Sequence, residues 1–102
     1  MDPFKPFQPK ARVAAPPKLS SEDAAAVALK ALAFVAGNDA LLSGFVALTG
    51  CGLDEIKGRM ADDAFLGAVL DFLLGDEAQL MNFIETEGLH PETPMLARHK
   101  LP

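Results

Sequence analysis

The chain has 102 residues, half of them hydrophobic, which suits a single domain with a core of its own. It carries 9 Lys or Arg against 14 Asp or Glu, a formal net charge of −5, and its one cysteine excludes an intramolecular disulfide. Tyr and Trp are absent, so phenolic acid–base chemistry is excluded as well. The longest strongly apolar stretch, 64–74, is shorter than the roughly 20 residues that span a bilayer. We therefore expect a cytoplasmic protein with no membrane segment.

The first 18 residues are predicted to form a flexible, proline-rich, basic arm ahead of one helical domain at 19–102. Five prolines favour extended, polyproline-like backbone in this segment. Four cations against one acid give the arm a net charge of +3, which leaves −8 for the domain. Phe4 and Phe7 are one polyproline turn apart, so both rings can face one side and contact a partner protein. The alternative is a tail whose rings lie on the domain's own surface.

Helix start and stop signals divide residues 19–102 into short helices. Ser, Asn or Asp precedes each expected helix, and glycine follows most of them, as is typical of helix caps. The expected N-caps are Ser20 or Ser21, Asn38 or Asp39, Asp54, Asp62 or Asp63, and Asp76. The expected helices cover 24–36, 40–48, 55–60, 64–74 and 77–86, with a last turn or short helix over 92–98. The predicted fold class is all-α, a compact bundle of about five short helices, because no segment has the alternation of a strand.

Two segments resemble each other at an offset of 38 residues. Residues 34–45 align with 72–83, with Phe, Gly, Ala, Leu and Phe at matching positions. The match predicts two related helical hairpins joined by the helix at 55–60. Tight helical hairpins in general place glycine before a capping acid, but that requirement does not explain the matching phenylalanines at both ends.

The helix faces point to candidate partner contacts. The apolar side chains of 64–74 span an arc of about 200°, twice the width that an ordinary surface helix needs. This helix is therefore expected to be central or to contribute to a second interface, with Phe65 and Phe72 as candidate partner-binding residues. Its only charge, Asp71, is either a buried acid or, as we favour, a solvent-facing one. The helix at 24–36 is alanine-rich and nearly uncharged, which agrees with a homodimer interface or with helix propensity alone.

The apolar residues of the remaining helices are assigned to the core. The assignment includes Leu48, Leu53, Met60 and Met81. In the helix at 24–36, the core stripe is assigned to Leu29, Leu32 and either Val35 or Ala36.

Residues suited to catalysis or metal binding are sparse. His90 and His99 follow the last strong helix without a ligand-spaced partner, and Cys51 has no cation beside it in the sequence. The acid pairs all open helices, where the helix dipole accounts for them. We expect no cofactor and no catalytic, cofactor-binding or metal-binding residue.

The leading functional hypothesis is a non-enzymatic protein–protein interaction or regulatory module, whose partner is another protein or a second copy. One alternative is a nucleic-acid-associated accessory protein that uses the basic arm, since the acidic domain itself repels phosphate. The other is a small metal- or ligand-binding domain around His90 or Cys51.

The runs ALAFVAGNDALLSGFVALTGCGLDEI and AFLGAVLDFLLGDEAQLMNFIETEGL resemble a small proteobacterial family of unknown function. Its members are short helical proteins with the patterns LAF-x-x-G-[ND] and VLDFLLGDE. The resemblance covers about 20–98 and leaves the arm outside. It implies an all-helical cytoplasmic protein and assigns no activity, substrate or catalytic residue.

Overall fold

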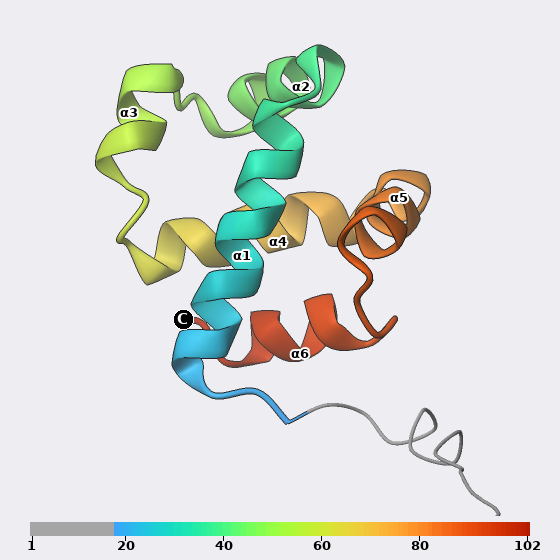
Figure 1. The fold of residues 1–102 in the computed structure, drawn as a ribbon. Helices are drawn as coiled ribbons and strands as arrows, with labels where there is room; N and C mark the ends of the chain where they lie inside the picture. Colours follow the sequence, from blue (N-terminus) through green and yellow to red (C-terminus); the bar gives the residue numbers. More distant parts are fainter. Residues whose placement is uncertain (1–17) are drawn as a thin grey trace, which may run out of the picture.

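The computed structural model describes residues 18–102, which form six α-helices and, within that range, no strand (Figure 1). The helices are α1 (Ser21–Ala36), α2 (Asp39–Thr49), α3 (Leu53–Gly58), α4 (Asp63–Leu74), α5 (Glu77–Glu87) and α6 (Thr93–His99). The all-α class is confirmed, and the last turn expected over 92–98 is a sixth helix. Of the predicted arm only Lys18 is described, so its flexibility and the domain boundary stay predictions.

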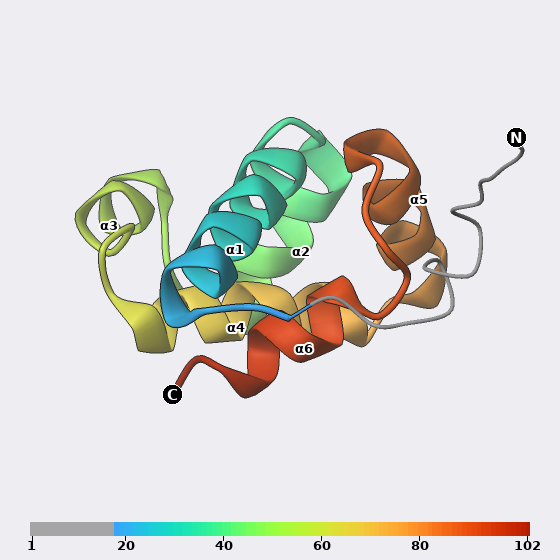
Figure 2. The ribbon, with the colours of Figure 1, turned by 60° about the horizontal axis from the view of Figure 1, so that its bottom comes forward.

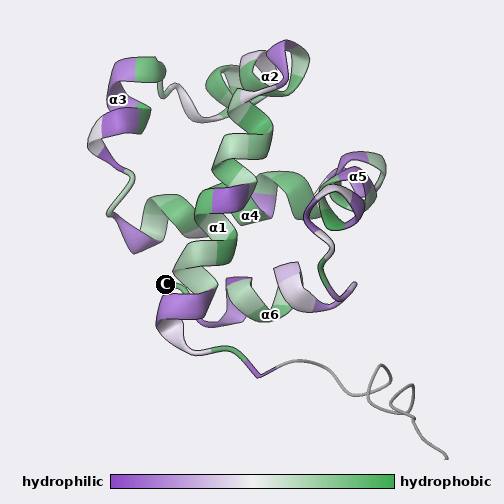
Figure 3. Cartoon of the chain, in the orientation of Figure 1, coloured by the Kyte–Doolittle hydropathy of each residue, from purple (hydrophilic) through white to green (hydrophobic). Residues whose placement is uncertain are grey.

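α1 and α4 are the central pair of helices. They cross and pack against each other, and α6 packs against both (Figures 1 and 2). α2 packs on α1, while α5 packs mainly on α4. Both central helices are hydrophobic along most of their length (Figure 3). The central position predicted for 64–74 is confirmed: α1, α5 and α6 pack against α4, and Phe45 of α2 contacts it as well, which is why its apolar arc is so wide.

Helix caps fall where the sequence placed them, with one exception. Ser20 and Asp23 form a capping box in which each side chain accepts a hydrogen bond from the other residue's backbone N–H. In α2, α4 and α5, the side chain of the N-cap Asn or Asp accepts one hydrogen bond from a backbone N–H of the first turn. The exception is α3, which begins at Leu53 after Gly52 and has no side-chain cap. Asp54, expected as the cap, lies in the first turn instead, where its charge favours the helix dipole.

The two segments that repeat in the sequence fold into equivalent hairpins. Gly37 and Gly75 end α1 and α4 with nearly the same backbone angles, φ −82° with ψ 0° and −4°. Gly50 and Gly88 end α2 and α5 with positive φ, 74° and 64°, a conformation that favours glycine. The predicted pair of related hairpins is confirmed at the level of backbone geometry.

The phenylalanines at the ends of the repeat pair across the two hairpins. The ring of Phe34 lies 5.5 Å from that of Phe83, and the ring of Phe45 lies 5.4 Å from that of Phe72. The first position of each repeat thus meets the last position of the other, a reciprocity that marks a two-fold relation. By the same relation α3 and α6 are counterparts, and they lie on opposite sides of the α1–α4 crossing (Figure 1).

Five large apolar residues assigned to the core are exposed instead. They are Leu29, Leu48, Leu53, Met60 and Met81. Each short outer helix buries only one line of side chains, and in the six-residue α3 that line contains Ile56 alone. An apolar residue off that line faces solvent, so a hydrophobic residue in a short helix is not by itself evidence of burial.

Between Lys18 and Pro102, no single helix is long and apolar enough to cross a membrane. α1 and α2 reach that length and composition only when taken together, and they are bent by 111° at the break between them.

Candidate functional site

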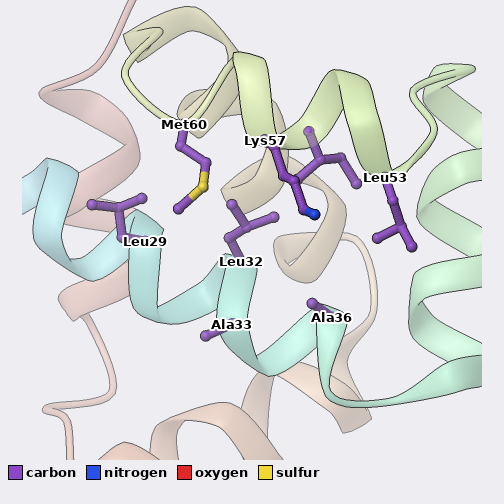
Figure 4. Close-up of a pocket in the computed structure, with 8 residues that line it drawn as sticks. Leu29, Leu32, Ala33, Ala36, Leu53, Lys57 and Met60 are labelled. Carbon is purple, nitrogen blue, oxygen red and sulfur yellow. The ribbon is translucent and has the colours of Figure 1, made fainter.

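α1 and α3 face each other across an apolar pocket of about 330 Å³ (Figure 4). On the α1 side the lining residues are Leu29, Leu32, Ala33 and Ala36. On the α3 side they are Leu53, Ile56, Lys57 and Met60, the last of which follows the helix. The side chains of the two walls point toward one another.

The pocket exists because α3 does not close onto α1. Leu32 on α1 and Ile56 on α3 are both buried and line the pocket from opposite walls. Beside them, Ala33 and Ala36 project only one carbon from α1 and leave space in front of α3. α3 has too few residues to bury a second line of side chains, so the space stays open at one side.

Large apolar side chains surround the pocket mouth. Leu29 is 37% exposed, Leu53 56% and Met60 45%. Soluble proteins scatter single exposed apolar residues over their surface, whereas a group around one hollow marks a binding surface. These three residues, with the pocket they surround, are called the α1–α3 surface below.

Lys57 is the only charged side chain that lines the pocket. Its stem extends from α3 toward α1 (Figure 4). Lysine commonly lays its aliphatic stem along apolar surface and keeps its ammonium group at the edge. Within residues 18–102, Lys57 forms no ion pair. The pocket can therefore hold an apolar group and, beside it, one negative charge.

The corresponding face of α4 is covered by the chain itself. Leu29 and Ala33 correspond to Gly67 and Asp71 at the repeat offset of 38. Over these two residues Arg98 donates a hydrogen bond from Nε to Asp71 Oδ1 at 2.7 Å. Its Nη1 donates to the carbonyl oxygens of Leu101 and Pro102, both at 3.1 Å. One repeat thus has a covered face where the other has an open pocket.

Asp71 is exposed, in agreement with the interpretation we favoured. Its side chain is 56% exposed and forms an ion pair with Arg98. The hydrogen bond that Arg98 donates to this carboxylate raises the pKa of Arg98, against an opposing effect of desolvation. The guanidinium therefore stays charged throughout the physiological pH range. Asp71 thus holds the end of the described chain in place through Arg98.

The predicted partner contacts on α4 lie in the aromatic core and do not line the pocket. Phe65 is 4% exposed and meets Phe45 edge-on at 5.8 Å. Phe72 is half-buried and also packs edge-on against Phe45. A partner would reach Phe65 only after a rearrangement of the core. Phe4 and Phe7, the other two predicted contacts, lie outside the described residues.

Sequence reasoning missed the residues of the α1–α3 surface. Leu29, Leu53 and Met60 were assigned to the core, and Lys57 was not singled out. Their own segments gave no signal for this exposure, because the similarly short α6 does bury three side chains. The alanine-rich face of 24–36 was recognised as a candidate interface, and Ala33 and Ala36 on that face do line the pocket.

The remaining reactive side chains do not gather into one site. Cys51 is a buried free thiol, and His90 Nδ1 accepts a hydrogen bond from the Glu92 backbone N–H at 3.1 Å. Over residues 18–102, no three His, Cys, Asp or Glu side chains come close enough together to hold a metal ion.

A family model described as "Protein of unknown function (DUF3572)" matches residues 21–102. No curated protein and no solved structure matches the chain.

Proposed function

The chain belongs to this family of proteins of unknown function, and from the geometry above we propose that it is a non-enzymatic protein–protein interaction module with a regulatory role. Its partner binds on the α1–α3 surface. The observation that carries the proposal is the grouping of Leu29, Leu53 and Met60 around one apolar pocket. Burying such a group on binding removes apolar area from water, and central apolar contacts supply most of the affinity at interfaces.

The predicted arm has a separate place in this proposal. Phe4 and Phe7 are its candidate contacts, and they would give the partner a second attachment point next to α1. Two linked contacts raise affinity well beyond either alone, provided that the linker spans both.

The first test is affinity capture from native lysate with the full chain, quantified by mass spectrometry. Met60→Glu places a charge on the α1–α3 surface. Met81→Glu is the matched control, because Met81 on α5 is 46% exposed against 45% for Met60. We expect the partner with the wild type and the control, and at least a tenfold loss with Met60→Glu, since a charge in an apolar contact is costly. Equal capture by both variants contradicts the proposed surface.

The arm is tested separately in the same assay. We compare the full chain with Phe4→Ala plus Phe7→Ala, and with a chain that begins at Leu19. A partner that neither the double Phe→Ala variant nor the shortened chain captures binds the arm. A partner that both of them still capture binds the helical domain. Sedimentation of the same variants shows whether the captured partner is a second copy.

A further inference from the structure

We propose that the pocket between α1 and α3 binds a small amphiphilic carboxylate, a molecule with one alkyl chain and one carboxylate head. The alkyl chain lies along α1, and the head pairs with Lys57. This pocket is part of the α1–α3 surface proposed above for the partner, so the ligand is a further occupant of the same place, and its binding can be tested without the partner. The size of the pocket, the chemistry of its walls and the position of its one charge support it.

The size of the pocket limits the ligand to a small molecule. A dry cavity of about 150 Å³ holds benzene, and pockets for small ligands start at about 300 Å³. A pocket of about 330 Å³ therefore has room for roughly a dozen non-hydrogen atoms. Its α1 wall runs from Leu29 to Ala36, which is about 10 Å along a helix. An elongated chain fits this shape better than a compact ring system.

The side chains that line the pocket favour a hydrocarbon ligand. Apart from Lys57, the lining side chains are Leu, Ile, Ala and Met, none of which can satisfy a hydroxyl or an amide. A ligand with several polar groups would lose its water there without replacement, at a cost of about 1–3 kcal/mol for each group. Sugars, nucleotides and amino acids are therefore disfavoured. An alkyl chain gives up no hydrogen bond to water when it enters the pocket, and its burial is favourable.

The single charge selects the head group. Lys57 has no ion-pair partner among the described residues, so its ammonium is available to an anion. The domain as a whole carries excess negative charge and repels anions at long range. At 0.1 M salt, charges more than about 10 Å away are largely screened. Asp54 and Glu55 lie on the same helix as Lys57, but neither lines the pocket, so Lys57 is the charge in contact with a ligand there. One ammonium group matches one singly charged head group, and of these we propose a carboxylate.

The related half of the molecule shows that this face can be covered. On α4, Arg98 in the last turn of α6 and Pro102 beyond it lie over Gly67 and Asp71, and Leu101 is buried. On α1, the chain after α3 turns directly into α4, with only four residues between the helices. Of these four, Met60 lines the pocket, and both Met60 and Leu29 stay exposed. A ligand with an apolar body and one charge supplies the missing cover.

The test is calorimetric titration of the purified full chain with decanoate, which has twelve non-hydrogen atoms, below its micelle concentration. Decylammonium is the matched probe of equal length and opposite charge. We expect saturable binding of one decanoate per chain and about tenfold weaker binding of decylammonium. The comparison is stringent, because the acidic domain as a whole attracts the cation. Absence of saturable decanoate binding overturns the proposal.

Three variants assign the site. Lys57→Met keeps the apolar stem and removes the charge, so decanoate should bind about fivefold more weakly, and the preference over decylammonium should disappear. Ala33→Leu fills the pocket and should abolish binding. Ala26→Leu is its control on an exposed position of α1 that does not line the pocket. If decanoate binds Lys57→Met and Ala33→Leu as it binds the wild type, the contact is detergent-like and the proposal is wrong.

Other occupants have their own signatures in amide spectra of the same samples. If the pocket residues shift on removal of residues 1–18 and not on addition of decanoate, the arm is the occupant. If the signals of the pocket residues shift with protein concentration alone, a second copy of the chain is the occupant. Either result overturns the carboxylate site. These measurements use purified protein without a partner. A negative decanoate titration therefore does not contradict the proposed protein partner, and a negative capture experiment does not contradict the carboxylate site.

Discussion

At the scale of single residues, Gly67 shows how closely the end of the chain packs on α4. A Cβ atom at this position would lie 3.0 Å from both the Arg98 guanidinium and the Pro102 carbonyl oxygen. Such distances are shorter than side chains normally tolerate, so Arg98 would have to move away from Asp71. Glycine in a helix is about 1 kcal/mol less favourable than alanine. At position 67, the missing Cβ atom is what allows Arg98 and Pro102 to pack this closely on α4.

Gly67→Ala is therefore expected to lower the free energy of unfolding by about 1 kcal/mol, since the clash outweighs the gain in helix propensity. The control is Gly44→Ala in α2, where a Cβ meets only Phe72 at 3.6 Å. That substitution should stabilise by about 0.5–1 kcal/mol. Urea denaturation measures both.

Removing the obstructing side chain provides a further check. In an Arg98→Ala background the cost of Gly67→Ala should shrink, because the guanidinium is no longer there. If both glycine substitutions stabilise equally in the wild-type background, the close approach at Gly67 is wrong.

At the scale of helices, the aromatic pairs hold the two hairpins together. Phe34 and Phe83 connect α1 to α5, and Phe45 and Phe72 connect α2 to α4. Edge-on or tilted ring pairs contribute about 0.5–1.5 kcal/mol beyond the area that they bury. Because the two pairs occupy corresponding positions, their contributions should be similar.

Double-mutant cycles with Phe→Leu test this expectation. The pairs Phe34 with Phe83 and Phe45 with Phe72 should each show a coupling energy of about 0.5–1.5 kcal/mol. The pair Phe34 with Phe72 is the control, since no ring contact joins these residues in the described part of the chain. It should couple by less than about 0.5 kcal/mol. Strong coupling in the control, or in only one of the two pairs, would contradict the two-fold relation.

At the scale of the whole molecule, packing is distributed unevenly between the two halves. α6 packs against both central helices, whereas α3, its counterpart, buries only Ile56. Helices shorter than about 12 residues are marginal in water and depend on packing for their stability. α3 is thus the least supported helix, and it forms one wall of the pocket.

Amide hydrogen exchange of the native protein should reproduce this order. We expect protection close to the global free energy of unfolding in α1 and α4, and little protection in α3. α6, of similar length, should be far better protected than α3. If α3 and α6 exchange equally slowly, the loose packing of α3 is wrong, and with it the open pocket.

Local signals determine which parts of this fold can be predicted. Ser20, Asn38, Asp62 and Asp76 cap helices through hydrogen bonds to residues two or three positions away, so the sequence marks these starts. The 38-residue match likewise places Phe and Gly at fixed positions in each hairpin. The central role of α4 followed from the width of its apolar arc.

The sequence by itself therefore determined the helices, the caps of α1, α2, α4 and α5, the repeat and the family, because each depends on neighbouring residues or on a recurring pattern. Only the tertiary structure decided which apolar residues are buried. Leu53 and Met60 are exposed because α3 stands off α1, while Phe65 is buried because α2 covers it. Burial depends on what packs against a side chain from elsewhere in the chain. The α1–α3 surface arises where that packing partner is missing, so the residues that form it could not be identified from their own segments.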